Sequence, residues 1–124
     1  MRVLLVDDNP EFVEEAEDFL SQMPGVTLVG WSFSAAEALD LLRRIDVDLV
    51  LLDVDMPGMG GLQAARAIKS RPGAPAVVLI SFHDGAAYQW AARCAGAEGF
   101  LSKNRLFTDL LPLVRSLSHS GRER

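Results

Sequence analysis

The sequence predicts an α/β fold: a doubly wound, five-stranded parallel sheet with helices on both of its faces. First, short apolar runs alternate along the chain with longer stretches in which apolar residues recur every three or four positions. Second, residues 49–52 and 76–80 are continuously apolar, which is typical of strands buried on both faces of a parallel sheet. Third, 49% of the 124 residues are hydrophobic, which is enough for a core.

Five strands are expected from the short apolar runs. They are residues 3–6, 26–30, 49–52, 76–80 and 99–101. The second run alternates more than the others, so we expect its strand nearer to an edge of the sheet. The third run stops at Asp53, before Met56-Pro57-Gly58, which cannot continue a strand. Asp53 is therefore expected at the carboxyl end of a central strand.

The first two helices have recognisable start signals. Asp8 or Asn9 can cap a helix with Pro10 in its first turn, and Pro24-Gly25 ends that helix. Its apolar face is expected to contain Phe12, Ala16, Phe19, Leu20 and Met23. Ser34 and Glu37 have the spacing of a capping box. The helix behind them is expected to bury Ala38, Leu41, Leu42 and Ile45.

The remaining three helices follow from apolar spacing alone. The third is marked by Leu62, Ala65 and Ile68, and the fifth by Leu106, Leu110, Val114 and Leu117. The fourth is expected to bury Ala87, Ala91, Cys94 and Ala95. Tyr88 and Trp90 cannot both join that face. Pro112 leaves two alternatives: the fifth helix starts near Thr108, or it is kinked at Pro112.

Composition narrows the classes of function. A net charge of -5 argues against nonspecific binding of nucleic acid or of an anionic membrane. Cys94 is the single cysteine, so neither an internal disulfide nor a cysteine-based zinc site is expected. The apolar start is too short for a signal peptide, and no later run approaches a membrane span. We therefore expect a soluble, cytoplasmic protein.

Chemically distinct polar residues follow four of the predicted strands. They are Asp7 and Asp8 after the first strand, Asp53 after the third, Ser81 after the fourth and Lys103 after the fifth. The carboxyl ends of parallel strands share one edge, where ligands bind in open α/β sheets, so these residues are expected to converge. Taken singly, each has an ordinary explanation as a turn, a cap or a solvated charge. Their joint placement favours a functional site.

This set of groups suits phosphoryl transfer. Clustered carboxylates repel one another, and a hard divalent cation such as Mg²⁺, which prefers oxygen ligands, relieves that repulsion. With Mg²⁺ bound, Asp53 remains ionised and can act as a nucleophile toward phosphorus. Mg²⁺ and Lys103 would neutralise charge on the transferring oxygens, and the Ser81 hydroxyl could donate a hydrogen bond.

Four motifs in order carry a resemblance to a known family. They are Val6-Asp7-Asp8-Asn9-Pro10, Leu52-Asp53-Val54-Asp55-Met56-Pro57-Gly58, the hydroxyl residue Ser81, and Gly99-Phe100-Leu101-Ser102-Lys103. With them, residues 2–118 resemble the receiver domain of response regulators in two-component signalling. The resemblance implies a flavodoxin-like (βα)5 fold, with a receiver domain at 1–118 and a tail or the start of a linker at 119–124. It also implies a phosphoacceptor rather than an enzyme.

The resemblance implies how the acids act. Asp53 would accept a phosphoryl group from a phosphohistidine of a sensor histidine kinase or phosphotransfer protein. Asp8 and Asp53 would bind Mg²⁺ together with the backbone carbonyl of Asp55, and Asp7 would act largely through water.

The resemblance also implies a switch. Lys103 would contact the acyl phosphate, Ser81 would swing toward it, and Phe100 would turn inward behind it. The fourth helix, fifth strand and fifth helix would then present a changed surface to a downstream output domain or protein, or to a second copy of the chain.

The sequence departs from the family pattern beside the site. Asn104 stands where proline usually follows the lysine, and Phe100 lacks the common tyrosine hydroxyl. Phe82 stands where a small residue is usual, and its ring could restrict access to Asp53. Asp55 and His83 occupy positions that tune rates in this family.

Two other functions remain as alternatives. A degenerate receiver would bind partners without being phosphorylated, and Phe82 and Asn104 leave room for that. Asp53-Val54-Asp55 also resembles the Asp-x-Asp motif of haloacid-dehalogenase-like phosphatases, in which the second aspartate is a general acid. That family usually carries the motif near the start of a longer chain, which argues against it here.

Overall fold

The computed structural model describes residues 1–56, 60–83 and 85–118. The strands are β1 Arg2–Val6, β2 Thr27–Ser32, β3 Leu49–Asp53, β4 Ala76–Ser81 and β5 Gly99–Ser102. The helices are α1 Pro10–Ser21, α2 Ala35–Leu41, α3 Gly61–Lys69, α4 Ala86–Cys94 and α5 Leu106–Leu117, with a 3₁₀ turn, η1 Lys103–Arg105, before α5. Within these ranges no helix combines the length and the apolarity needed to cross a bilayer. The predicted break at residues 57–58 and the tail at 119–124 lie outside the described residues.

The strands form one parallel sheet in the order β2-β1-β3-β4-β5, which confirms the predicted fold class. The chain winds outward in one direction from β1 to β2 and in the other from β3 to β5. The carboxyl ends of β1 and β3 therefore flank the reversal point at which doubly wound sheets bind ligands. β2 is an edge strand, as its alternating pattern predicted.

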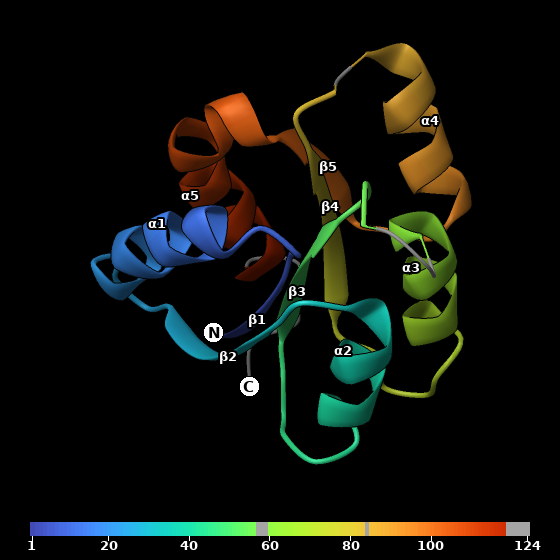
Figure 1. The fold of residues 1–124 in the computed structure, drawn as a ribbon, viewed down its shortest axis with the longest axis horizontal. Helices are drawn as coiled ribbons and strands as arrows, with labels where there is room; N and C mark the ends of the chain where they lie inside the picture. The colour runs from blue at the N-terminus through green and yellow to red at the C-terminus, as the bar shows by residue number, and fades with distance from the viewer. Residues whose placement is uncertain (57–59, 84, 119–124) are drawn as a thin grey trace.

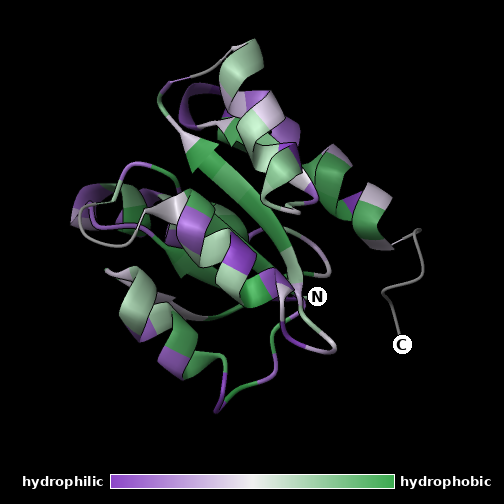
Figure 2. Cartoon of the chain, turned by 90° about the vertical axis from the view of Figure 1, so that its right-hand side faces the viewer, coloured by the Kyte–Doolittle hydropathy of each residue, from purple (hydrophilic) through white to green (hydrophobic). Residues whose placement is uncertain are grey.

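Helices cover both faces of the sheet (Figure 1). α1 and α5 lie on one face, and α2, α3 and α4 lie on the other. Side chains of a strand alternate between faces, so Val3 and Leu5 pack toward α1 and α5, whereas Leu4 and Val6 pack toward the other three helices. The side chains of β3 and β4 alternate between the same two faces. Their continuous apolar runs thus supply two cores, and Figure 2 shows green strands between helices striped in purple and green.

Helix α1 begins as predicted, with Asn9 rather than Asp8 as its cap. The side-chain oxygen of Asn9 accepts hydrogen bonds from the backbone N–H groups of Glu11 and Phe12. The inner face of α1 buries Phe12, Val13, Ala16 and Leu20. Of the other two residues predicted for this face, Phe19 is half-buried, and Met23 is buried but follows the end of the helix. The cap matters for the site because it holds the segment after β1, including Asp7 and Asp8, at the carboxyl edge of the sheet.

Helix α2 is shorter than predicted. Ser34 Oγ accepts from the N–H of Glu37 at 3.2 Å, which is one half of the capping box. The Glu37 carboxylate, however, accepts from the N–H of Phe33 at 3.1 Å instead of from that of Ser34. The helix ends at Leu41, so Leu42 and Ile45 lie in the following turns. Leu41, Leu42 and Ile45 are half-buried rather than buried. The predicted inner face was therefore right for Ala38 and too long at its far end.

The buried face of α4 differs from the prediction. Ala92 and Ala95 are buried, and Tyr88 is half-buried against the same core. Of the other predicted residues, Ala91 is half-buried, and Ala87 and Cys94 are exposed. The physical reason is that Tyr88 points inward, and residues four and seven positions later then share its face. Trp90 is 67% exposed, in agreement with the prediction that both rings could not be buried.

Helix α5 runs from Leu106 through Pro112, so the alternative start near Thr108 is wrong. Its four predicted core residues, Leu106, Leu110, Val114 and Leu117, are all buried. Pro112 is exposed, which keeps its ring out of the core. α5 therefore packs along β5 and leads away from the carboxyl edge of the sheet.

Candidate functional site

The carboxyl edge of the sheet brings the predicted residues together. Asp7 and Asp8 follow β1, Asp53 is the last residue of β3, Ser81 is the last residue of β4, and Lys103 begins η1 after β5. β3 lies between β1 and β4 and is hydrogen-bonded to both. Residues that are far apart in the sequence thus become neighbours because of the strand order.

Lys103 lies between two of the acids. Its Nζ is 2.6 Å from Asp7 Oδ2 and 3.4 Å from Asp53 Oδ2. The side chains of Lys103, Asp7 and Asp53 are 5%, 0% and 3% exposed. Buried charges are tolerated when they are paired, which explains how three of them lie together in one buried cluster. Two carboxylates and one ammonium leave an unbalanced negative charge when both acids are ionised.

Asp53 is held in an environment that disfavours its charge. Burial raises the pKa of Asp53 above its ordinary value of 3.8, and the negative charge of Asp7 adds to that increase. The backbone N–H of Asp55, 3.1 Å from Asp53 Oδ1, and the Lys103 ammonium oppose the increase. Asp53 is therefore a largely dehydrated carboxyl group beside a fixed cation.

The acids fit a divalent cation. Asp7, Asp8 and Asp53 each offer one carboxylate oxygen, and the three oxygens lie within 4.8 Å of one another. A donor set made of oxygen alone suits Mg²⁺. Among the described residues, buried Asp7 Oδ2 receives no hydrogen bond of ordinary geometry, although Lys103 Nζ is 2.6 Å away. Asp8 is exposed, so the cluster is open to a hydrated ion on its solvent side.

Ser81 points into a small hydrogen-bond network at the end of β4. Its hydroxyl donates to Asp55 Oδ2 at 2.6 Å and accepts from the backbone N–H of His83 at 2.9 Å. Ser81 is fully buried, whereas Asp55 is exposed. Asp55 therefore contacts the site twice, through its backbone N–H to Asp53 and through its carboxylate to Ser81.

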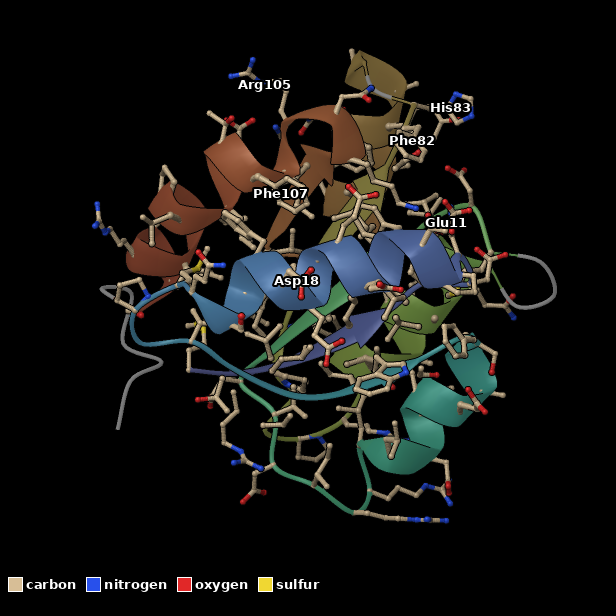
Figure 3. The ribbon with its side chains drawn as sticks, turned by 60° about the vertical axis from the view of Figure 1, so that its left-hand side comes forward. Glu11, Asp18, Phe82, His83, Arg105 and Phe107 are labelled. Carbon is tan, nitrogen blue, oxygen red and sulfur yellow. The ribbon has the colours of Figure 1, made fainter. Side chains whose placement is uncertain are left out.

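Two phenylalanine rings surround the ammonium of Lys103. Its Nζ lies 4.6 Å from the ring centre of Phe12 and 5.0 Å from that of Phe82, within the range of cation–π attraction. The two rings meet edge to face, with centres 6.5 Å apart. Figure 3 shows Phe82 and His83 beyond the N-terminal end of α1, where Glu11 is labelled. Phe82 is 54% exposed and so forms part of the outer boundary of the site.

Phe100 is connected to the same loop by a chain of rings. It is buried, and its ring centre lies 5.9 Å from that of Tyr88. Tyr88 in turn stacks on His83, with ring centres 5.8 Å apart and planes 10° apart. The loop after Ser81 thus contacts Lys103 through Phe82 and leads to Phe100 through His83.

Three contacts were not anticipated from the sequence: those of Phe12, of Tyr88 and of the Asp55 side chain. Phe12 was placed on the apolar face of the first helix, and the start of that helix at the carboxyl edge was the available signal for its contact with Lys103. For Asp55 only the backbone carbonyl was expected to take part. Nothing in the sequence distinguishes a carboxylate that points to solvent from one that reaches Ser81.

Comparison with known proteins identifies the family. Residues 3–115 match the family model of the response regulator receiver domain. This chain belongs to that family. It is a receiver domain of the kind found in two-component response regulators, and receiver domains generally act as phosphoacceptors and not as enzymes.

Curated relatives and solved structures agree with this assignment. A probable transcriptional regulatory protein NarL of Mycobacterium tuberculosis is 40% identical over 114 residues, which are 92% of this chain and 53% of that protein. The nitrate/nitrite response regulator protein NarP of Escherichia coli is 31% identical over 93% of this chain and 54% of its own length. The solved receiver domain of the Mycobacterium tuberculosis NarL has a TM-score of 0.86 and 38% identity, with 95% of each chain covered. The receiver domain spans about half the length of these curated relatives.

Proposed function

We propose that this receiver domain takes a phosphoryl group onto Asp53 from a phosphohistidine of a sensor histidine kinase or a phosphotransfer protein. The observation that carries the proposal is the buried Asp53 carboxyl group, with the Lys103 ammonium 3.4 Å away and two further acids beside it. An Asp53 carboxylate oxygen would attack phosphorus while the bond from phosphorus to the donor imidazole nitrogen breaks, and the imidazole leaves.

The negative charge on the transferring phosphoryl group would be neutralised by Mg²⁺, which the acids would bind, and by Lys103. Asp8 and Asp53 would bind Mg²⁺ with the backbone carbonyl of Asp55, and Asp7 would act largely through water. Mg²⁺, when bound, supplies positive charge beside the transferring oxygens. Lys103 would hold a phosphoryl oxygen, and its contacts with Asp7 and Asp53 keep its ammonium within reach of that position.

Phosphorylation would act as a switch between two arrangements. Ser81 would move its hydroxyl toward the phosphoryl group, and Phe100 would fill the space behind it, so that the α4–β5–α5 surface changes. Trp90 on α4, 67% exposed, supports a partner-binding role for that surface because tryptophan is enriched in protein–protein interfaces. The partner would be an output domain, an output protein or a second copy of this receiver.

The remaining properties follow from the same proposal. Residues 1–118 would form the receiver domain, and 119–124 would be a tail or the start of a linker. A following output domain that controls transcription is proposed because relatives that are about twice as long are named as transcriptional regulators. A cytoplasmic location is part of the proposal, and the net charge of -5 supports a domain that does not itself bind nucleic acid or an anionic membrane.

A phosphorylation-independent receiver is the second candidate. It is favoured by one observation: the Phe82 ring packs beside Lys103 at the outer boundary of a site in which Asp53 is 2% exposed. Such a domain would use the same surface for binding, but Asp53 would never carry a phosphoryl group.

Intact mass after incubation with acetyl phosphate and Mg²⁺ tests the proposal. We expect an adduct of the mass of one phosphoryl group that requires Mg²⁺ and is absent from the Asp53→Asn variant. An adduct of equal yield in Asp53→Asn would place the acceptor elsewhere. No adduct from acetyl phosphate or from a panel of phosphorylated kinases would favour the phosphorylation-independent receiver, and rapid turnover of a phosphate ester would favour a phosphatase.

A further inference from the structure

The Ser81 hydroxyl is already committed to a partner. It donates to Asp55 Oδ2 at 2.6 Å and accepts from the N–H of His83 at 2.9 Å. A distance of 2.6 Å is typical of a hydroxyl that donates to a carboxylate, and such bonds are stronger than those between neutral groups. A hydroxyl carries a single proton, so Ser81 cannot donate to another group while this bond persists.

Asp55 reaches Ser81 because of its place after β3. Its backbone N–H donates to Asp53 Oδ1, which fixes the turn against the end of the strand. Its carboxylate then reaches the end of the neighbouring strand β4, where Ser81 lies. Ser81 is fully buried, so the carboxylate of Asp55 is the acceptor that the fold supplies to its proton.

We propose that the Asp55 carboxylate is a latch that holds the Ser81 hydroxyl away from the phosphoryl position and so opposes the phosphorylated arrangement. This inference rests on the proposed function, in which Ser81 donates to a phosphoryl oxygen on Asp53. One proton cannot serve Asp55 and the phosphoryl group at once. A two-state equilibrium shifts by the difference between the contacts that each state makes, so loss of the latch favours the phosphoryl-bound state.

The latch gives Asp55 the role of a positioning residue that acts through Ser81. Removal of its carboxylate also removes a negative charge near the phosphoryl position, which by itself would favour phosphorylation. The two effects differ in one respect: the charge effect does not need the Ser81 hydroxyl, whereas the latch does. A double-mutant cycle with Ser81→Ala therefore separates them.

The test measures the affinity for beryllofluoride in the presence of Mg²⁺, because this ion is a non-covalent stand-in for the phosphoryl group. Asp55→Ala should bind it about tenfold more tightly than the unmodified chain, as expected for the loss of one charge-assisted hydrogen bond. The affinity of Asp55→Asn, whose neutral amide oxygen is a weaker acceptor, should fall between those of Asp55→Ala and the unmodified chain. In the Ser81→Ala background the gain from Asp55→Ala should be less than about twofold.

Asp18→Ala is the matched control, because it removes one exposed carboxylate from α1, away from Ser81. Its affinity should equal that of the unmodified chain. An equal gain from Asp55→Ala with and without the Ser81 hydroxyl would assign the effect to charge and overturn the latch. Unchanged affinity in Asp55→Ala would overturn it as well.

A second measurement tests the Asp55–Ser81 contact on which the latch depends, even if the proposed function fails. If the unmodified chain binds no beryllofluoride, the failure belongs to the proposed function. The backbone N–H of His83, which donates to Ser81 Oγ, then reports on Ser81 in the free protein by NMR. Asp55→Ala should shift the His83 amide resonance relative to the unmodified chain. When Asp55→Ala is added to Ser81→Ala, the resonance should stay where it is in Ser81→Ala alone. An unmoved resonance would overturn the latch.

Discussion

Lys103 illustrates how a buried cation is satisfied with little help from water. Its Nζ lies 2.6 Å from an oxygen of the Asp7 carboxylate and 3.4 Å from an oxygen of the Asp53 carboxylate, so two negative charges face it. The rings of Phe12 and Phe82 cover another side at cation–π distance. A side chain that is 54% exposed would ordinarily be read as a solvated hydrophobic residue, but Phe82 contributes to the surroundings of a charge in the site.

Phe82→Ala is expected to speed phosphorylation by small donors several-fold, because the ring lies at the outer boundary of the site beside Lys103. The measurement is the initial rate of phosphate incorporation from acetyl phosphate at fixed Mg²⁺. Phe82→Leu is the matched control, since it keeps most of the bulk and removes the aromatic face. A rate for Phe82→Ala equal to that of the unmodified chain would mean that the ring does not obstruct the site.

The pH dependence of stability in the absence of metal reports on Asp53. Its pKa is raised by burial, so the folded state binds its proton more tightly than the unfolded state. The contribution of Asp53 to stability is therefore present below its ordinary pKa of 3.8 and is lost as the pH rises through the raised pKa of the folded state.

Asp53→Asn should consequently gain stability relative to the unmodified chain as the pH rises from acid to neutral. Urea unfolding with EDTA present, at a series of pH values, gives the difference in the free energy of unfolding. A difference that shrinks toward neutral pH would show that pairing with Lys103 outweighs desolvation at Asp53.

For individual residues of the site, the sequence predicted which residues lie together but not how their side chains pair. Asp7, Asp53, Ser81 and Lys103 were placed at one edge because each follows a strand. The pairing of Lys103 with Asp7 at the shorter distance and the bond from Ser81 to Asp55 depend on rotamers and loop geometry, which leave no periodic signal in a sequence.

Helix α3 shows how one element supports the site through its first residue. Gly61 packs its backbone against the end of β3: a Cβ there would lie 2.5 Å from the carbonyl oxygen of Asp53 and 2.6 Å from the Cα of Val54. Both neighbours are backbone atoms, so neither can move without moving the end of β3. This close approach requires glycine for reasons of space.

Gly61→Ala should lower the free energy of unfolding by about 2 kcal/mol, because overpacking against backbone atoms forces the helix away from the strand. The neighbouring Gly60→Ala is the matched control, since a Cβ there meets nothing within 4 Å and its φ of -69° suits any residue. Chemical denaturation of both variants measures the change. Equal stability of Gly61→Ala and the unmodified chain would mean that α3 shifts freely.

The buried face of a helix was predicted well where only one of its faces is apolar. It was predicted poorly where more than one face carries small apolar residues. α5 buried all four residues expected from its spacing, and α1 buried three of its five, whereas Phe19 is half-buried and Met23 is buried after the end of the helix. In α4, small residues occur on several faces, and the inward-pointing Tyr88 selects the face with Ala92 and Ala95. Small side chains tolerate either burial or exposure, so the pattern alone could not choose between them.

For the whole molecule, alternation of apolar runs was sufficient to predict the parallel sheet, its edge strand β2 and the shared carboxyl edge. The order of the strands was not predicted, because alternation does not determine which strand lies beside which. That order puts β3 between β1 and β4, so it determines which functional groups become neighbours. Fold and location of the site were therefore predictable, whereas the contacts around Asp55 and Phe82 required the structure.

The direction of α5 also has a practical consequence. Gly99, at the start of β5, faces Leu113 near the end of α5, so the helix returns antiparallel to the strand. Its 12 residues span about 18 Å. A tether, label or surface attachment joined after Leu117 thus begins at the pole opposite Asp53. Protein immobilised in this way keeps Asp53 and the carboxyl edge of the sheet facing the solution.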